Sequence, residues 1–145
     1  MTIRIVISGQ PVAKGRPRMT RNGHAYTPEK TANWETIAKW EARRQFDGEP
    51  LDGALDVQVY AYFAIPESWP KWKKQAAISG TVLHTVKPDG DNIAKCVDAF
   101  NGILWTDDAR IASLSVHKSY GVEPRVVVVV TSLEFALHSG SKRAA

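Results

Sequence analysis

The sequence holds a single cysteine, Cys96, among its 145 residues. One thiol excludes an intramolecular disulfide and a zinc site built from several cysteines. The longest apolar run is Val126–Val130, far below the ~18 residues that a membrane-spanning helix needs. The N-terminal stretch Met1–Ile7 lacks the layout of a signal peptide. These absences predict a protein of the cytoplasm.

The chain also has no internal repeat and no stretch with the composition of a linker, which at this length predicts one domain. Hydrophobic residues make up 43% of the chain and charged residues 23%, values ordinary for a globular protein with a real core. We expect the domain to span residues 1–138. The small and polar residues 139–145 are expected to form a flexible tail.

Acidic residues are concentrated in one part of a basic chain. The chain carries 19 Lys and Arg against 15 Asp and Glu, a net charge of +4. Between Lys87 and Arg110, however, five Asp face three cationic residues, a net of −2, which leaves +6 for the remainder. A small acidic cluster in a cationic protein suggests a divalent metal held against a polyanion. That is the charge distribution of a metal-dependent nuclease.

Hydrophobic periodicity predicts strands and helices in alternation. Apolar and polar residues alternate most regularly in Leu55–Phe63. A turn at Gly121–Pro124 predicts that the last two strands form a hairpin. Residues 9–26 have the composition of a long polar loop. The expected elements are strands at 3–7, 55–63, 111–120 and 125–133, helices at 27–46 and 91–101, and a short basic helix ending near Gly80. This order predicts an α+β domain whose small mixed or antiparallel sheet carries two main helices.

Two acids stand two positions apart in the segment 87–95, Lys-Pro-Asp-Gly-Asp-Asn-Ile-Ala-Lys. If the backbone there is extended, Asp89 and Asp91 point to the same side, and their repulsion calls for a cation. Mg²⁺, which prefers oxygen ligands, suits such a site. The alternative is a turn followed by a helix that Asp91 caps. Spacing alone favours neither interpretation.

Other charged residues extend this candidate site. Lys95 follows Asp91 by one helical turn and can stabilise charge on a phosphate or orient a water; the alternative, favoured for this residue alone, is a surface ion pair with Asp91. Asp107 and Asp108 precede the strand that starts near Ile111. Adjacent residues point in opposite directions, so we expect one of the two to reach the acidic site and the other to cap the turn. An ordinary Asp-rich turn is the alternative.

Two basic segments are candidates for DNA contact. The first, 14–21, has four positive charges in eight residues and no acid, a pattern that can neutralise phosphates; a solvated charged loop is the alternative and is favoured on this pattern alone. Its cations are Lys14, Arg16, Arg18 and Arg21. The second, Trp69–Lys74, interleaves tryptophans with lysines, among them Lys73 and Lys74, a pattern that can grip bases or backbone. Two tryptophans on a short helix, however, more often pack on a core.

Three motifs together resemble the RusA family of Holliday-junction resolvases, which is common in bacteria and their prophages. A strand is followed by Gly-x-Pro-x-x-Lys-Gly-Arg-Pro-Arg at 9–18; Pro-Asp-x-Asp-Asn-(Ile/Leu)-x-Lys lies at 88–95; and Asn-Gly-Ile-(aliphatic)-(aromatic)-x-Asp-Asp-x-x-Ile lies at 101–111. The motifs cover most of the chain in the right order. The resemblance implies a RusA-like fold and a homodimeric, Mg²⁺-dependent endodeoxyribonuclease. Such an enzyme resolves four-way DNA junctions by paired symmetric cleavage, with Mn²⁺ as an expected substitute for Mg²⁺.

The resemblance also implies roles for individual residues. Metal binding falls on Asp89, Asp91 and Asp108, and a role essential for cleavage falls on Lys95. One departure is visible: the family places an Asp four residues after the lysine, whereas Asp98 follows Lys95 by three. On an α-helix this shortening rotates the carboxylate by about 100°, so the role of Asp98 stays open.

Two other functions compete with junction resolution. One is a non-catalytic DNA-binding module whose acids only cap a helix; it needs no Mg²⁺, so metal titration separates the two. The other is a nuclease that acts on flaps or replication forks. Cleavage of four-way junctions compared with matched linear duplex distinguishes that enzyme from a resolvase.

Overall fold

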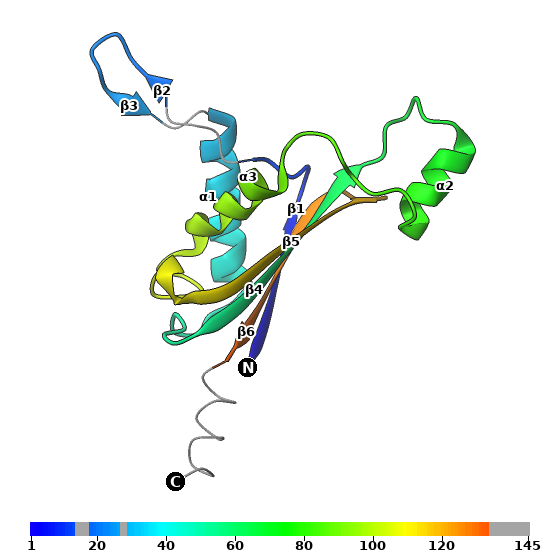
Figure 1. Ribbon diagram of the computed structural model, residues 1–145. Coiled ribbons are helices and arrows are strands. Elements are labelled where there is room, and N and C mark those ends of the chain that lie inside the picture. The colour runs from blue at the N-terminus through cyan, green and yellow to red at the C-terminus, as the bar shows by residue number, and fades with distance from the viewer. Residues whose placement is uncertain (14–17, 27–28, 134–145) are drawn as a thin grey trace.

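A four-stranded mixed sheet forms the centre of the protein, with strand order β1-β6-β4-β5 (Figure 1). The structure is a computed structural model that describes residues 1–13, 18–26 and 29–133. The strands are β1 (Thr2–Ser8), β4 (Leu55–Ala64), β5 (Ile111–Gly121) and β6 (Arg125–Ser132). Strand β6 is antiparallel to β1 and to β4, whereas β4 and β5 are parallel. This architecture confirms the predicted α+β class.

Helices cover one face of the sheet and extend beyond its end. They are α1 (Glu29–Gln45), α2 (Lys71–Ser79), α3 (Gly90–Ala94) and the 3₁₀ turns η1 (Lys95–Phe100) and η2 (Asp108–Arg110). The segment expected to be a polar loop contains a small hairpin, β2 (Arg18–Met19) and β3 (Ala25–Tyr26). The expected helix start at residues 27–28 and the tail at 139–145 lie outside the described residues. In the described part, no helix combines the length and hydrophobicity that crossing a membrane requires.

The predicted hairpin between the last two strands is wrong, because β4 lies between β5 and β6. The valine run of β6 explains this order. Val127 is buried on one face of the strand, while Val126 and Val128 are buried on the other. A strand buried on both faces belongs in the middle of a sheet. Most residues of β5 are at least partly exposed, which suits an edge.

The parallel pairing of β4 with β5 requires a long crossover connection. Residues 65–110 provide it, and they carry α2, α3 and η1 from one end of the sheet back to the other. The crossover therefore places the acidic segment against the sheet.

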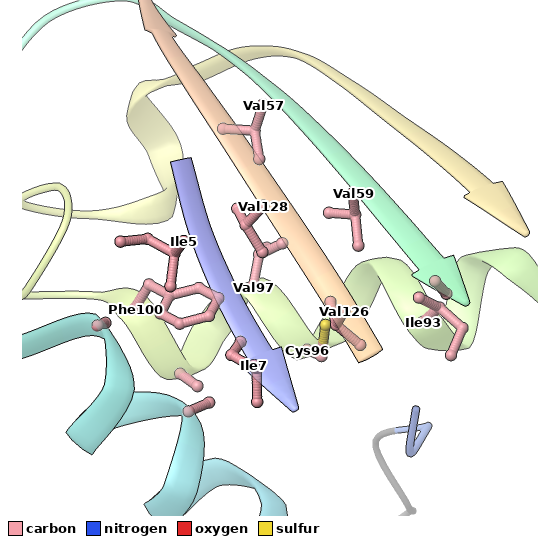
Figure 2. Close-up of a cluster of buried hydrophobic side chains, with 14 of the residues drawn as sticks. Ile5, Ile7, Val57, Val59, Ile93, Cys96, Val97, Phe100, Val126 and Val128 are labelled. Atoms are coloured by element: carbon pink, nitrogen blue, oxygen red, sulfur yellow. The ribbon is translucent and has the colours of Figure 1, made fainter. Parts of the chain in front are cut away.

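The apolar side of α3 and η1 packs into the core (Figure 2). Ile93, Val97 and Phe100 stand at the helical spacing i, i+4 and i+7, and they are 1%, 4% and 0% exposed. Figure 2 shows them with Cys96 facing side chains of β1, β4 and β6, such as Ile5. Since the apolar residues point toward the sheet, the charged residues between them remain near the solvent.

A compact turn around Trp105 connects η1 to η2. Its indole is fully buried and donates from Nε1 to Asn101 Oδ1 at 2.7 Å. Gly102 has a φ of +80°, a backbone conformation that glycine adopts at little cost. The Leu51 N–H donates to the Leu104 carbonyl at 2.9 Å. These bonds fix the position of the residues that follow, Asp107 and Asp108.

Residues 81–88, here called the His84 strap, lead from α2 to α3. They contain no strand and no helix. The His84 ring is 8% exposed and stacks on Phe63 with 3.6 Å between ring centroids. Lys118 Nζ donates to the Val86 carbonyl at 2.8 Å. Burial, reinforced by the charge of Lys118, lowers the pKa of His84.

We predict that replacing His84 with Phe flattens the acid side of the stability curve. The ordinary pKa of His84 is 6.5, and its folded-state pKa lies lower. As the pH falls below about 6.5, the unfolded chain therefore binds a proton that the folded chain does not, and stability is lost. Between about pH 7.5 and pH 5, the unfolding temperature of His84→Phe should fall less than that of the wild type. The control is His24→Phe, which changes an exposed histidine. Equal losses in all three proteins would contradict the prediction.

Candidate active site

Helix α3 begins at the pair of acids that the sequence singled out. Asp89, not Asp91, occupies the N-cap position, with φ −67° and ψ 152°, and its side chain makes no capping hydrogen bond. Asp91 lies in the first turn. The expected extended geometry, which would place both side chains on one side, is therefore wrong from Gly90 onward. Both side chains are exposed to solvent. Because the Asp89 carboxylate makes no capping bond, it is accessible to a ligand.

Lys95 lies one helical turn beyond Asp91, as predicted. Its backbone N–H donates to the Asp91 carbonyl. Its ammonium makes a long hydrogen bond to Asn92 Oδ1 at 3.4 Å rather than an ion pair with Asp91. The sequence did not predict this contact of Asn92. Its position as the last residue of the Pro-Asp-x-Asp-Asn motif was the signal that could have drawn attention to it. The Lys95 ammonium is exposed and free to meet an anion.

The 3₁₀ geometry of η1 decides the position of Asp98. In a 3₁₀-helix, residues three apart lie on the same side, whereas in an α-helix the nearest match is four apart. The expected rotation by about 100° assumed an α-helix and is wrong, because Lys95–Phe100 is a 3₁₀ turn. Asp98 thus lies on the same side of the turn as Lys95.

Lys95, Asp98 and Asp108 meet at an open depression of about 310 Å³. We call it the acidic hollow. Its remaining lining residues are Ala94, Val97, Ile111 and Leu114. The hollow joins η1, the start of η2 and the first residues of β5, three segments that the crossover and the Trp105 turn bring together.

Carboxylates lie close together in the hollow, and their proximity raises a pKa. Hydrogen-bonding contact with the Asp98 carboxyl raises the pKa of Asp108, and loss of water contacts and the neighbouring Asp107 raise it further. One of the two adjacent acids lines the hollow, as predicted, and it is Asp108. Asp107 occupies the N-cap of η2 without a side-chain capping bond. Arg110 does not relieve the crowding, because its Nε pairs with Asp52 at 2.9 Å.

The donor set fits a hard divalent cation of the Mg²⁺ type. Across residues 1–13, 18–26 and 29–133, no three His, Cys, Asp or Glu side chains approach closely enough to enclose a metal ion. The expected trio of Asp89, Asp91 and Asp108 is therefore not assembled. Mg²⁺, however, is commonly bound by one or two carboxylates, with water and substrate phosphate completing the shell. Asp98 and Asp108 provide such a pair.

The basic loop is only partly described. Lys14 and Arg16 lie outside the described residues, and so does the side chain of Arg18, although its backbone forms β2. Arg21 lies in the exposed turn between β2 and β3. Figure 1 shows this hairpin projecting from the body of the protein. Its position favours contact with an extended ligand.

Comparison with known proteins identifies the class of this chain. The family model for "Endodeoxyribonuclease RusA" matches residues 8–131. The chain therefore belongs to the RusA endodeoxyribonuclease family, as its motifs predicted. Membership confirms the prediction of a nuclease and disfavours the non-catalytic binding module.

Two relatives show how far the similarity extends. The Bacillus subtilis (strain 168) protein named "Uncharacterized protein YqaN" is 36% identical over 134 residues, which cover 88% of this chain and 94% of the relative. The Aquifex aeolicus (strain VF5) protein named "Crossover junction endodeoxyribonuclease RusA" is 34% identical over 58 residues. These cover 39% of this chain and 46% of that protein.

We predict that relief of carboxylate crowding stabilises the metal-free protein. Asp108→Asn removes one charge from the hollow, so its unfolding temperature in EDTA near pH 7 should exceed that of the wild type, because like charges repel. Millimolar Mg²⁺ should raise the unfolding temperature of the wild type more than that of the variant. Asp47→Asn, an exposed acid outside the acidic segment, serves as control. Identical Mg²⁺ shifts in all three proteins would exclude Asp108 as a ligand.

Proposed function

We propose that this protein is a Mg²⁺-dependent endonuclease that resolves four-way DNA junctions by paired cleavage. The observation that carries the proposal is the acidic hollow, in which two crowded carboxylates lie beside a lysine. The printed name of the Aquifex aeolicus relative, a crossover junction endodeoxyribonuclease, supports the choice of substrate. A DNA substrate also supports the expected location in the cytoplasm.

The proposed roles follow from the positions of the side chains. Asp98 and Asp108 would hold the metal directly. Within the described residues, Asp89 and Asp91 do not form a group with them that encloses an ion; they would act from the start of α3 through metal-bound water. Bound there, Mg²⁺ supplies an acidified water and polarises a phosphate, and Mn²⁺ is expected to substitute. Lys95, which lines the hollow, would stabilise the charge that develops on the scissile phosphate.

Phosphate contacts outside the hollow would hold the arms of the junction. We assign them to the basic loop, through Lys14, Arg16, Arg18 and Arg21. Because each neutralised phosphate releases counterions, such contacts make binding strongly dependent on salt. They position the DNA without reading its sequence.

A homodimer would bring two hollows to one junction. A junction has approximate two-fold symmetry, which a two-fold dimer matches. The two edges of the sheet differ: Gln45 hydrogen-bonds both the N–H and the carbonyl of Val6 in β1, at 2.9 and 2.7 Å. In the described part of the chain, β5 pairs with β4 alone, and Leu114 on it is 42% exposed. An open strand edge invites pairing, so we propose β5 as interface.

We predict that Asp89→Asn, Asp91→Asn and Asp108→Asn bind junctions but do not cleave them. Loss of negative charge leaves affinity for DNA unchanged or higher, whereas loss of a ligand removes the metal-dependent step. The measurement combines gel-shift binding with cleavage of a synthetic four-way junction, with and without Mg²⁺. Asp47→Asn should cleave like the wild type.

Matched linear duplex and a flap substrate test the class of DNA in the same assay. If the protein cleaves the flap in preference to the four-way junction, the flap-nuclease alternative holds and junction resolution is rejected. Cleavage at the wild-type rate by Asp89→Asn would remove that residue from the site.

We also predict a dimer in solution. Light scattering at micromolar concentration should give about twice the chain mass of 16.0 kDa, because two cuts need two hollows. Leu114→Lys places a charge on the open face of β5 and should shift the mass toward that of the monomer. A monomeric wild type that nicks single strands without coupling would contradict paired cleavage.

A further inference from the structure

Helix α2 carries a concentration of positive charge that helix stability does not explain. Residues 65–80 contain three lysines and one acid, Glu67. The lysines, at 71, 73 and 74, stand at the start of α2, and the first turn holds no acid. The N-terminus of a helix is its positive end, so cations are unfavourable there. A charge distribution that opposes the helix dipole indicates an anionic partner.

The two tryptophans of this segment have different surroundings. Trp69 is half-buried and meets Tyr120 edge to face, with 5.0 Å between ring centroids. Lys73 places its ammonium 4.0 Å above the Trp69 ring. These two residues fasten α2 to β5, which confirms the packing interpretation for Trp69. Trp72, by contrast, is 69% exposed, so its indole contributes little to the core.

Lys71 and Trp72 are adjacent, exposed residues at the start of α2. Lys74 lies one turn beyond Lys71, on the side of it away from Trp72. The start of α2 therefore offers a bare aromatic ring with one ammonium group beside it and a second ammonium group one turn further on. That combination suits nucleic acid whose bases are unstacked, because lysines contact phosphates while the ring stacks on a base. An intact duplex hides the faces of its bases, and branched DNA exposes some of them.

Helix α2 lies apart from the acidic hollow. Figure 1 shows it beyond the end of β4 and β5, away from the β2–β3 hairpin. Leu114 lines the hollow and Tyr120 contacts the α2 segment; six residues of β5 separate them, roughly 20 Å at the rise of a strand. Trp72 therefore cannot touch the scissile phosphate, but it can reach the same DNA molecule.

We propose that α2 is a second DNA contact, in which Trp72 stacks on an unstacked base and Lys71 and Lys74 hold adjacent phosphates. This contact selects branched over linear DNA. The inference rests on the proposed function, because it takes DNA as the ligand. It assigns α2 to substrate selection, not to chemistry.

The test measures binding of the full chain, without Mg²⁺, to a four-way junction and to matched linear duplex. Trp72→Ala should weaken junction binding by roughly 5- to 100-fold and leave duplex binding unchanged, and Trp72→Phe should retain most of the affinity. Trp40→Ala is the matched control, since Trp40 on α1 is 62% exposed. Lys71→Gln with Lys74→Gln should weaken binding to both DNAs and reduce the salt slope by about two.

Wild-type affinity of Trp72→Ala for the junction would overturn the proposal, and so would an equal loss on junction and duplex. Circular dichroism and the unfolding temperature verify that each variant is folded. Junction cleavage by the wild type in Mg²⁺ is scored separately. If cleavage is absent while Trp72→Ala loses junction affinity, the proposed function fails and the α2 contact stands. If cleavage is intact and Trp72→Ala binds normally, the α2 contact alone fails.

Discussion

The packing of α3 and η1 against the sheet is the constraint on which the candidate active site depends. Ile93, Val97 and Phe100 are buried against the central strands, and burial of such side chains stabilises the fold by about 1.5–3 kcal/mol each. Because these anchors fix the rotation of the segment, the charged residues between them are held at the surface. The segment formed by α3 and η1 thus contributes side chains both to the hydrophobic core and to the candidate active site.

This arrangement places like charges close together. The contact with the Asp98 carboxyl raises the pKa of Asp108, and the nearby negative charges add to this by repulsion. The repulsion that Asp108 experiences persists beside two cations: Arg110 pairs with Asp52 through its Nε, and Lys95 makes a long hydrogen bond to Asn92. A bound divalent cation would relieve this repulsion, and the free energy gained by that relief would add to the affinity for the metal.

Positive charge is distributed around this acidic centre. The β2–β3 hairpin carries Arg21, and α2 carries lysines beyond the far end of β5. A polyanion is attracted by such surfaces over a distance of several ångströms. The carboxylates alone would repel it, so only with a metal in place does the centre of the surface become attractive. Under the proposed function, the separation of these cations from the acidic hollow would let affinity for DNA and cleavage be altered independently.

The sequence by itself determined the four main strands, most of the helical segments and the family. Alternation in Leu55–Phe63 and the apolar spacing of Ile93, Val97 and Phe100 are local signals, and three motifs were enough to indicate the RusA family. Tertiary structure decided what depends on partners distant in sequence. The position of β4 between β5 and β6 follows from burial of the valine run on both faces. Likewise, the 3₁₀ form of η1 placed Asp98 on the same side as Lys95, which the α-helical spacing of Ile93, Val97 and Phe100 did not predict.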